Sequence, residues 1–253
     1  MTAATVGRFR AARRDPARVV LEGLHAVKHA LRFGAAIETA VSPDPPAAVA
    51  LAASLAPDVA QRLEALLEPV ERAVFDQLAS APPATGVLAI AARPPTGEPA
   101  TRPDRPLVVL DGPSHLGNLG AAIRVAAAAD AAGVVVIGAA DPWHPTAVRG
   151  AAGLQFALPC RRVARASELA RPLVGFDASG EPLAQAAVAA GSALAFGGER
   201  HGLTAATRTV AARLVALPMR PGVASLNLAT AVAAALYTLA PPAAQAWRSE
   251  ITG

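Results

Sequence analysis

The chain has 253 residues, a formal net charge of +4 and 53% hydrophobic residues, enough for one large domain or two modest ones. Its one cysteine, Cys160, excludes an internal disulfide framework and a zinc site built from several thiolates. No apolar run reaches the roughly 18 residues of a membrane helix without an interruption. The basic N-terminus lacks the apolar region of a secretory signal, so we expect a cytoplasmic protein that binds no membrane.

Arginine supplies nearly all the positive charge, because Lys28 is the only lysine. Two clusters stand out, and we predict that both bind nucleic-acid phosphate because the guanidinium fork matches phosphate oxygens. Exposed arginines in an alanine- and arginine-rich chain are also often merely solvated, and that alternative stays open. The clusters are an N-terminal arm with Arg8, Arg10, Arg13, Arg14 and Arg18, and a second group with Arg161, Arg162 and Arg165.

The N-terminal part of the chain predicts a small α/β domain. "VVLEGLHAVKHALRFG" (19–34) indicates a short strand and then a helix closed by glycine. A strand follows in 37–43, an amphipathic helix in 58–69 and a buried strand in 85–92. His25 and His29 lie one helical turn apart, but no third ligand stands near them, so we predict no metal site.

A proline-rich stretch, "RPPTGEPATRPDRP", has the composition of a linker and divides the chain. We therefore predict an N-terminal domain over 1–92, a linker over 93–105 and a second domain over 106–253.

The second domain repeats a short apolar strand, a loop of small residues and a helix. Runs of Val, Leu and Ala without alternation are typical of strands buried on both faces, so we predict a mainly parallel sheet covered by helices. Ligands of such folds bind at the carboxyl ends of the strands. The predicted strands are 106–111, 133–138, 173–178, 193–198 and 213–219.

Polar and glycine residues follow three of these strands. After the first, we expect Asn118 to be the N-cap of a helix on which Gly120 leaves space for Arg124. After the fourth, Glu199 follows two glycines that would let a ligand approach the backbone. After the fifth, Ser225 lies at the mouth of an apolar helix, where it would cap that helix together with a nearby asparagine.

Three motifs at these strand ends resemble those of a known family. "GNLGAAIRVA", "FGGERHGL" and "LPMRPGVASLNLATAVAAALY" are similar, in order and spacing, to the three motifs of the SpoU/TrmH branch of the SPOUT RNA methyltransferases. The resemblance covers 106–240, and 18–92 more loosely resembles the small RNA-binding domain that many members carry.

The resemblance implies a fold and an activity. The fold is a SPOUT-like α/β domain with a C-terminal trefoil knot, assembled as a homodimer with a composite active site. The activity is methyl transfer from S-adenosylmethionine to a ribose 2′-hydroxyl of ribosomal RNA or transfer RNA. A non-catalytic RNA-binding protein that keeps this fold is the alternative.

The resemblance also assigns site residues. Arg124 would either accept the hydroxyl proton or orient the hydroxyl, and we favour orientation because guanidinium stays protonated in proteins. The predicted catalytic residues are Arg124, Asn118, Glu199, Ser225 and Asn227. The predicted cofactor-binding residues are Gly197, Gly198, Gly202, Leu217, Met219, Ser225, Leu226 and Asn227.

Overall fold

The computed structural model describes residues 2–95, 102–223 and 225–239. Contacts between these residues define two compact units. The first unit combines the N-terminal part of the chain with Leu116–Arg124 and Asp141–Pro159, and the second contains the other described residues. Residues 96–101 of the predicted linker lie outside the described residues, and the predicted domain boundaries stay a prediction.

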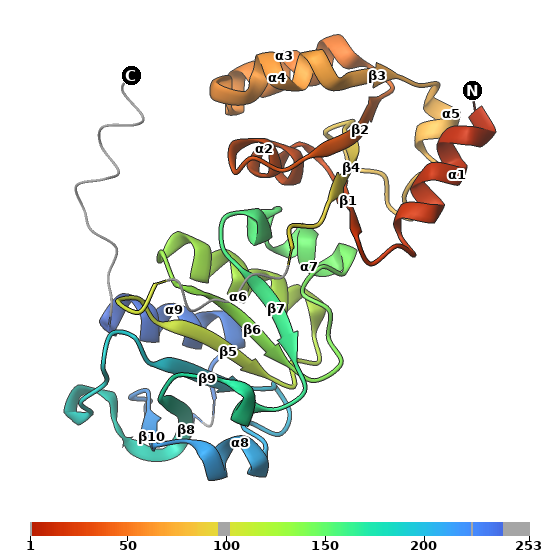
Figure 1. Ribbon diagram of the computed structural model, residues 1–253. Helices are drawn as coiled ribbons and strands as arrows, with labels where there is room; N and C mark the ends of the chain where they lie inside the picture. Colours follow the sequence, from red (N-terminus) through yellow and green to blue (C-terminus); the bar gives the residue numbers. More distant parts are fainter. Residues whose placement is uncertain (1, 96–101, 224, 240–253) are drawn as a thin grey trace. The chain divides into compact units, whose positions relative to one another are not determined.

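The first unit is built around a small mixed sheet with strand order β1-β4-β2-β3 (Figure 1). β4 runs antiparallel to both β1 and β2, and β2 is parallel to β3. Its strands are β1 (Arg18–Glu22), β2 (Ile37–Ser42), β3 (Leu67–Pro69) and β4 (Leu88–Ala92). Its N-terminal helices are α1 (Thr2–Ala12), α2 (Leu24–Arg32), α3 (Pro45–Leu55), α4 (Pro57–Leu66) and α5 (Arg72–Phe75).

The strands and helices predicted for this part of the chain are confirmed. The segment predicted as a basic arm is partly a helix with one buried face. It contains the helix α1, whose Val6, Phe9 and Ala12 are buried in a cluster that also contains Phe75 and Leu78. The spacing of the three buried residues, each three positions apart, places them on one helix face. Their burial fixes α1 against the sheet, a packing that the many arginines of the segment had obscured.

α6 and α7 approach each other closely inside the first unit. A Cβ atom on Gly120 of α6 would overlap the carbonyl oxygen of Ala147 in α7, and one on Gly150 would lie 3.0 Å from the carbonyl oxygen of Gly117. Gly120 is therefore needed for helix packing, and the prediction that it leaves space for Arg124 is wrong. The bounds are α6 (Leu116–Ala128, with its N-terminal part in this unit), α7 (Pro145–Gly150) and a short 3-10 helix (Leu154–Phe156).

Within the described residues, the second unit contains a six-stranded sheet in the order β10-β8-β9-β5-β6-β7, and every neighbouring pair is parallel (Figure 1). This confirms the predicted parallel sheet. The strands are β5 (Leu107–Asp111), β6 (Gly133–Ile137), β7 (Cys160–Val163), β8 (Leu173–Pro182), β9 (Ala193–Gly197) and β10 (Arg213–Ala216). The helical elements are α8 (Ala205–Val210), α9 (Leu228–Leu239) and the short 3-10 helices Ala166–Glu168 and Leu183–Gln185.

The strand order places a topological switch point at β5. The chain proceeds from β5 to β6 and β7 on one side, and β8, β9 and β10 then build the other side. Asp111, at the carboxyl end of β5, is in register with Gly197, at the carboxyl end of β9. Ligands of open α/β sheets bind at such a point, so this edge is where a site is expected.

β8 is longer than the sequence predicted and departs from β10 in its middle. Leu214 pairs with Gly175, but the next residue of β10, Val215, pairs with Glu181. The intervening residues of β8, which begin with Phe176, have no register partner in β10. This irregularity frees the segment after Gly175 to line a cavity.

Candidate functional site

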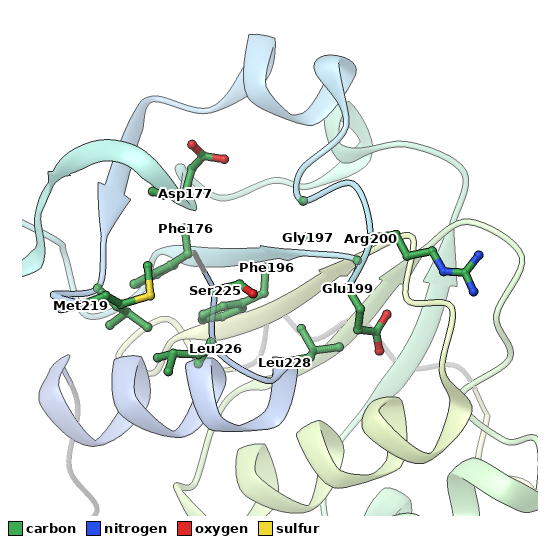
Figure 2. Close-up of a pocket in the computed structure, with 15 residues that line it drawn as sticks. Phe176, Asp177, Phe196, Gly197, Glu199, Arg200, Met219, Ser225, Leu226 and Leu228 are labelled. Carbon is green, nitrogen blue, oxygen red and sulfur yellow. The ribbon is translucent and has the colours of Figure 1, made fainter. Parts of the chain in front are cut away.

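A cavity of about 390 Å³ lies at the carboxyl edge of the second unit's sheet. Its walls come from the irregular middle of β8, the end of β9 and the loop after it, the loop after β10 and the start of α9. Figure 2 shows Phe176 and Met219 toward one end and Glu199 and Arg200 toward the other. The cavity therefore joins segments that lie up to some fifty residues apart in the chain.

Two glycines form a wall that admits no side chain. A Cβ atom on Gly197 would overlap the backbone of Gly202 and Leu203, and one on Gly198 would lie 2.5 Å from the carbonyl oxygen of Gly112. The amide of Gly202 donates to the carbonyl oxygen of Gly198 over 3.0 Å, which closes the turn after β9. Close packing of the chain on itself thus requires both glycines, and their backbone forms part of the cavity lining.

A second part of the cavity lining is apolar. The rings of Phe176 and Phe196 stack with centroids 4.6 Å apart and an interplanar angle of 13°. Both rings line the cavity, together with Leu217, Met219 and Leu226. Apolar walls beside exposed backbone groups suit a flat heterocyclic ring.

Two carboxylates line the cavity. Glu199 accepts hydrogen bonds from the amide and the hydroxyl of Ser114, over 3.2 and 3.0 Å. Asp177 accepts from the hydroxyl and amide of Ser179 and pairs with Arg208. Burial raises the pKa of Asp177, but the hydrogen bonds from Ser179 and the charge of Arg208 outweigh burial, so this pKa lies below its usual range. Asp177 therefore stays negatively charged at neutral pH.

A third carboxylate, Asp111, is buried beside the cavity and holds the turn after β9. One of its oxygens accepts from the amide of Thr204 over 2.7 Å, and its other oxygen is buried without a hydrogen-bond partner among the described residues. Because β5 fixes Asp111, this bond ties the turn that contains Gly202 to the centre of the sheet.

The structure brings most of the predicted cofactor-binding residues together. The cavity is lined by seven of the eight, namely Gly197, Gly198, Gly202, Leu217, Met219, Ser225 and Leu226. Asn227 does not line it. Of the five predicted catalytic residues, Glu199 and Ser225 line this cavity, whereas Asn118 and Arg124 belong to the first unit. Arg124 lines a second cavity, in that unit.

Two predicted helix caps are corrected by the structure. Asn118 is not the N-cap of α6, because Leu116 and Gly117 are already helical and the N-cap is His115. Ser225 does not cap α9 either, since that helix begins at Leu228. Asn227 is the capping residue: its side-chain oxygen accepts from the amide of Ala229 over 2.9 Å and from that of Thr230 over 3.4 Å.

We expect Asn227→Ala to lower the free energy of unfolding by about 1 kcal/mol, because the variant loses the acceptor for these two amides. Asn227→Asp keeps an oxygen acceptor and should retain most of the stability. Thermal or denaturant unfolding of both variants measures the difference. Equal losses in the two variants would contradict the capping role.

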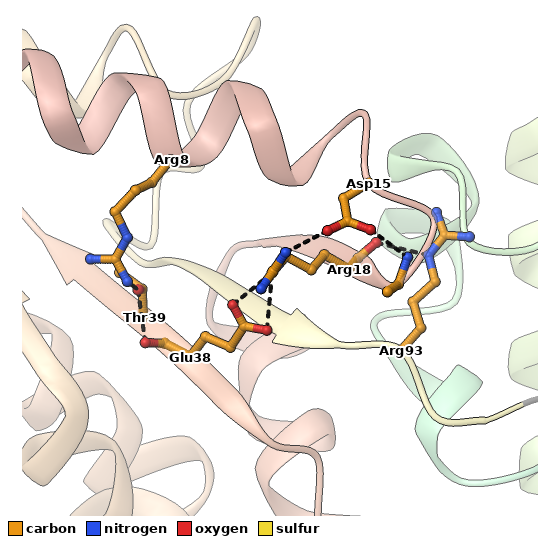
Figure 3. Close-up of polar contacts among 7 residues, drawn as sticks. Arg8, Asp15, Arg18, Glu38, Thr39 and Arg93 are labelled. Carbon is orange, nitrogen blue, oxygen red and sulfur yellow. Dashed lines mark hydrogen bonds and ion pairs between the residues drawn. The ribbon is translucent and has the colours of Figure 1, made fainter.

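Several arginines predicted to bind RNA have partners within the first unit (Figure 3). Arg8 donates to the hydroxyl of Thr39, Arg13 pairs with Glu22 over 2.9 Å, and Arg18 pairs with Asp15 and Glu38. The remaining two, Arg10 and Arg14, are exposed. RNA binding by these arginines stays a prediction, and Arg10 and Arg14 are its best-placed members.

The second arginine cluster lies on and after β7, the edge strand of the second unit. Arg162 donates to the carbonyl oxygen of Ala139 over 3.0 Å, and Arg161 is half-buried. The amide of Arg165 donates to the carboxylate of Glu168 over 3.1 Å in a capping box. Sequence analysis missed β7 because its two arginines interrupt the apolar pattern. RNA binding by this cluster also stays a prediction.

Sequence analysis also missed part of the cavity lining. Phe176 and Asp177 end the apolar run of one predicted strand, and Phe196 precedes the paired glycines of another. An aromatic residue at the carboxyl end of a parallel strand was the available signal. Leu228 and Ala231 of α9 carried no such signal, because they belong to its continuous apolar pattern.

Two classes of feature are absent from the described ranges. No helix in residues 2–95, 102–223 or 225–239 is long and apolar enough to cross a membrane. The same residues contain no group of three His, Cys, Asp or Glu side chains that could hold a metal ion.

A parallel sheet with an apolar, glycine-walled cavity at the carboxyl ends of β8, β9 and β10 is typical of α/β proteins that bind small organic ligands. The profile of the SpoU rRNA Methylase family matches residues 105–237, more than half of the chain. The chain belongs to this family.

Known proteins similar to this chain are RNA methyltransferases. The 23S rRNA (uridine(2479)-2'-O)-methyltransferase of Streptomyces viridochromogenes is 34% identical over 144 residues, which cover 51% of this chain and 50% of that protein. The 23S rRNA (guanosine-2'-O-)-methyltransferase RlmB of Bordetella pertussis is 35% identical over 143 residues, 52% of this chain and 57% of that protein. The chain thus matches about half the length of these curated relatives.

A solved structure is similar to this chain over nearly its whole length. The crystal structure of the SpoU methyltransferase AviRb from Streptomyces viridochromogenes, in complex with the cofactor AdoMet, matches with a TM-score of 0.77 and 27% identity. The match covers 94% of this chain and 97% of that chain. The fold of both the N-terminal and C-terminal parts of the sequence therefore has a counterpart in this family.

Proposed function

We propose that this protein transfers the methyl group of S-adenosylmethionine to a ribose 2′-hydroxyl of RNA. The observation that carries the proposal is the cavity at the carboxyl ends of β8, β9 and β10, in a chain of the SpoU rRNA Methylase family. The names of the relatives favour ribosomal RNA as the substrate, and the AdoMet complex of AviRb favours the cofactor.

The residues of the cavity fit S-adenosylmethionine. A volume of about 390 Å³ lies within the range of small-molecule sites. Phe176, Met219 and Leu226 offer apolar surface to an adenine ring, and the turn at Gly197 and Gly198 offers backbone groups. The cavity carboxylates can accept hydrogen bonds from hydroxyl and ammonium groups. We infer that these residues hold the cofactor.

The protein's task is to bring a ribose hydroxyl to the cofactor in the right orientation. When bound, S-adenosylmethionine supplies a methyl group on a positively charged sulfur. Ser114 holds Glu199 at the cavity, and Ser225 adds a hydroxyl to its lining. We propose that Arg124 orients the ribose hydroxyl and binds the adjoining phosphate, because its guanidinium keeps its proton.

Methyl transfer to RNA tests the function. Purified protein, S-adenosylmethionine with a radiolabelled methyl group and total bacterial RNA are incubated, and the modified ribose is then mapped. We expect label in RNA at a 2′-O-methylated nucleotide. Calorimetric binding of the cofactor without label in any RNA would contradict the proposed enzyme and favour the alternative, a non-catalytic RNA-binding protein.

We further propose a homodimer with a composite active site, and a trefoil knot in the second domain, as the family resemblance predicts. If each site takes Arg124 from one subunit and the cofactor cavity from the other, variants impaired in these two parts should complement each other. The activities are compared at a cofactor concentration near the wild-type dissociation constant, where Gly198→Ala binds little cofactor. Arg124→Ala and Gly198→Ala, refolded together, should then recover about a quarter of wild-type activity, since half of the dimers are mixed and each has one intact site. Activity no higher than that of the separate variants would contradict the composite site.

A further inference from the structure

A second cavity, of about 560 Å³, lies inside the first unit. It is lined by the start of α2, by the loop that contains Pro83 and Thr85, and by residues of α6 and α7. Sequence analysis gave no function to the α2 residues that line it, and the proposed methyl transfer uses only Arg124 among its lining residues.

Positive groups dominate the lining. Lys28 from α2, Arg124 from α6 and Arg149 from α7 supply the positive charge, and the imidazoles of His25 and His29 of α2 also line the cavity. The lining has one carboxylate, Glu22, which already pairs with Arg149 and with Arg13. The cavity therefore keeps an excess of positive charge.

The acid whose charge acts on Lys28 is already paired with another residue. Asp58 attracts Lys28, but Asp58 accepts two hydrogen bonds from Arg32, over 2.7 and 2.6 Å. Among the described residues, neither Lys28 nor Arg124 makes an ion pair with a carboxylate. Two cations thus face a cavity that supplies no free counter-charge.

The electrostatics of the neighbouring groups agree with this arrangement. Burial lowers the pKa values of His25, Lys28 and His29, and the positive charge of Arg124 lowers each of them further. His29 is held by a hydrogen bond from its Nδ1 to the carbonyl oxygen of Ala152, over 2.7 Å. A bound anion would relieve the mutual repulsion of Lys28 and Arg124.

The start of helix α2 adds to the positive electrostatic potential in this cavity. α2 begins at the cavity with Gly23 and Leu24 in its lining. The N-cap Gly23 has φ 98° and offers no side-chain cap, and the first turn of α2 contains no acidic residue. The amide of Leu24 donates to the hydroxyl of Thr85 over 2.9 Å, which leaves the helix start without a negative charge bound to it. The positive end of the helix dipole therefore acts in the same direction as Lys28 and Arg124.

We propose that this cavity binds a phosphate group of the RNA backbone, held by Lys28 and Arg124 at the start of α2. The proposal rests on the proposed function, because Arg124 is there assigned to the reacting nucleotide. His25, Arg124 and Arg149 are exposed, so the cavity is open to a phosphate that remains part of a chain. α2 then helps to position the nucleotide that is methylated.

Salt-dependent RNA binding tests the proposal. Lys28→Gln removes one charge from the cavity and keeps a good helix former. Arg72→Gln is the matched control, because it removes one charge from the same unit at a side chain that is 65% exposed and does not line the cavity. Binding of a fluorescent single-stranded RNA of mixed sequence is measured by anisotropy at several salt concentrations. We expect the slope of log affinity against log salt to fall by roughly 0.7 for Lys28→Gln and to stay unchanged for Arg72→Gln.

Chemical labelling gives a second measurement, because Lys28 is the only lysine. The aldehyde of pyridoxal 5′-phosphate, an anionic probe, condenses with the Lys28 amine to an imine and water, and added borohydride reduces the imine to a stable secondary amine. We expect mass spectrometry to find the label on Lys28, and added RNA to protect this residue more strongly than inorganic phosphate does. Stronger protection by inorganic phosphate would identify a small-anion site and overturn the proposal.

The outcomes separate this proposal from the proposed function. An unchanged salt slope for Lys28→Gln, with wild-type protein still methylating RNA, would overturn the phosphate site and leave the enzyme standing. A reduced slope and protected Lys28, with no methyl transfer by wild-type protein, would support the phosphate site and overturn the enzyme.

Discussion

Gly198→Ala is expected to weaken S-adenosylmethionine binding by roughly 10- to 100-fold, the size of a typical overpacking penalty. The new Cβ would lie 2.5 Å from the carbonyl oxygen of Gly112, and backbone cannot yield as a flexible side chain can. The turn after β9 would have to move, and this turn forms one wall of the cavity. Isothermal calorimetry measures the affinity.

Gly112→Asn provides the matched control for this variant. Gly112 has φ +63°, a conformation that asparagine tolerates, and a Cβ there would meet no atom within 4 Å. Gly112 does not line the cavity, so the control should bind the cofactor as wild type does. Wild-type affinity in Gly198→Ala would show that the cofactor binds elsewhere.

Arg124→Ala is expected to reduce methyl transfer at saturating RNA by roughly 100- to 1000-fold, the usual loss when one positioned charged donor is removed. The cofactor affinity should not change, because Arg124 does not line the cavity proposed to bind the cofactor. The fold should also survive, since Arg124 is exposed and alanine favours a helix more than arginine does. Single-turnover methyl transfer, calorimetry and thermal unfolding measure the three quantities.

Arg124→Lys separates charge from geometry. Lysine keeps the positive charge but lacks the planar fork, so it should restore little of the methyl transfer. It should restore most of the salt-dependent RNA binding, because the phosphate contact needs mainly charge. Near-normal transfer in Arg124→Ala would remove this residue from the reaction, and a joint loss of stability and cofactor affinity would make it structural.

Local patterns in the sequence predicted much of the fold. The five predicted strands of the second domain are all present, because short continuous runs of Val, Leu and Ala bounded by loop residues are typical of strands buried on both faces. The same patterns failed where arginines interrupt them, in α1 and β7. There, tertiary packing on the apolar face of α1, with Phe9 fully buried, outweighs the polar composition.

The sequence by itself determined the class of fold, the family and most of the glycines and apolar residues of the cavity at the ends of β8, β9 and β10, because each of these follows from short-range patterns at strand ends. Tertiary structure alone decided which strand ends lie next to each other in space. It placed Phe176 beside Phe196, bound Glu199 to Ser114 and brought Lys28 and Arg124 into one cavity. Strand order and helix packing arise from contacts between distant residues, and such contacts leave no periodic signal in the chain. The cap of α9 shows the same limit, since only the structure shows that the helix begins at Leu228 and is capped by Asn227 and not by Ser225.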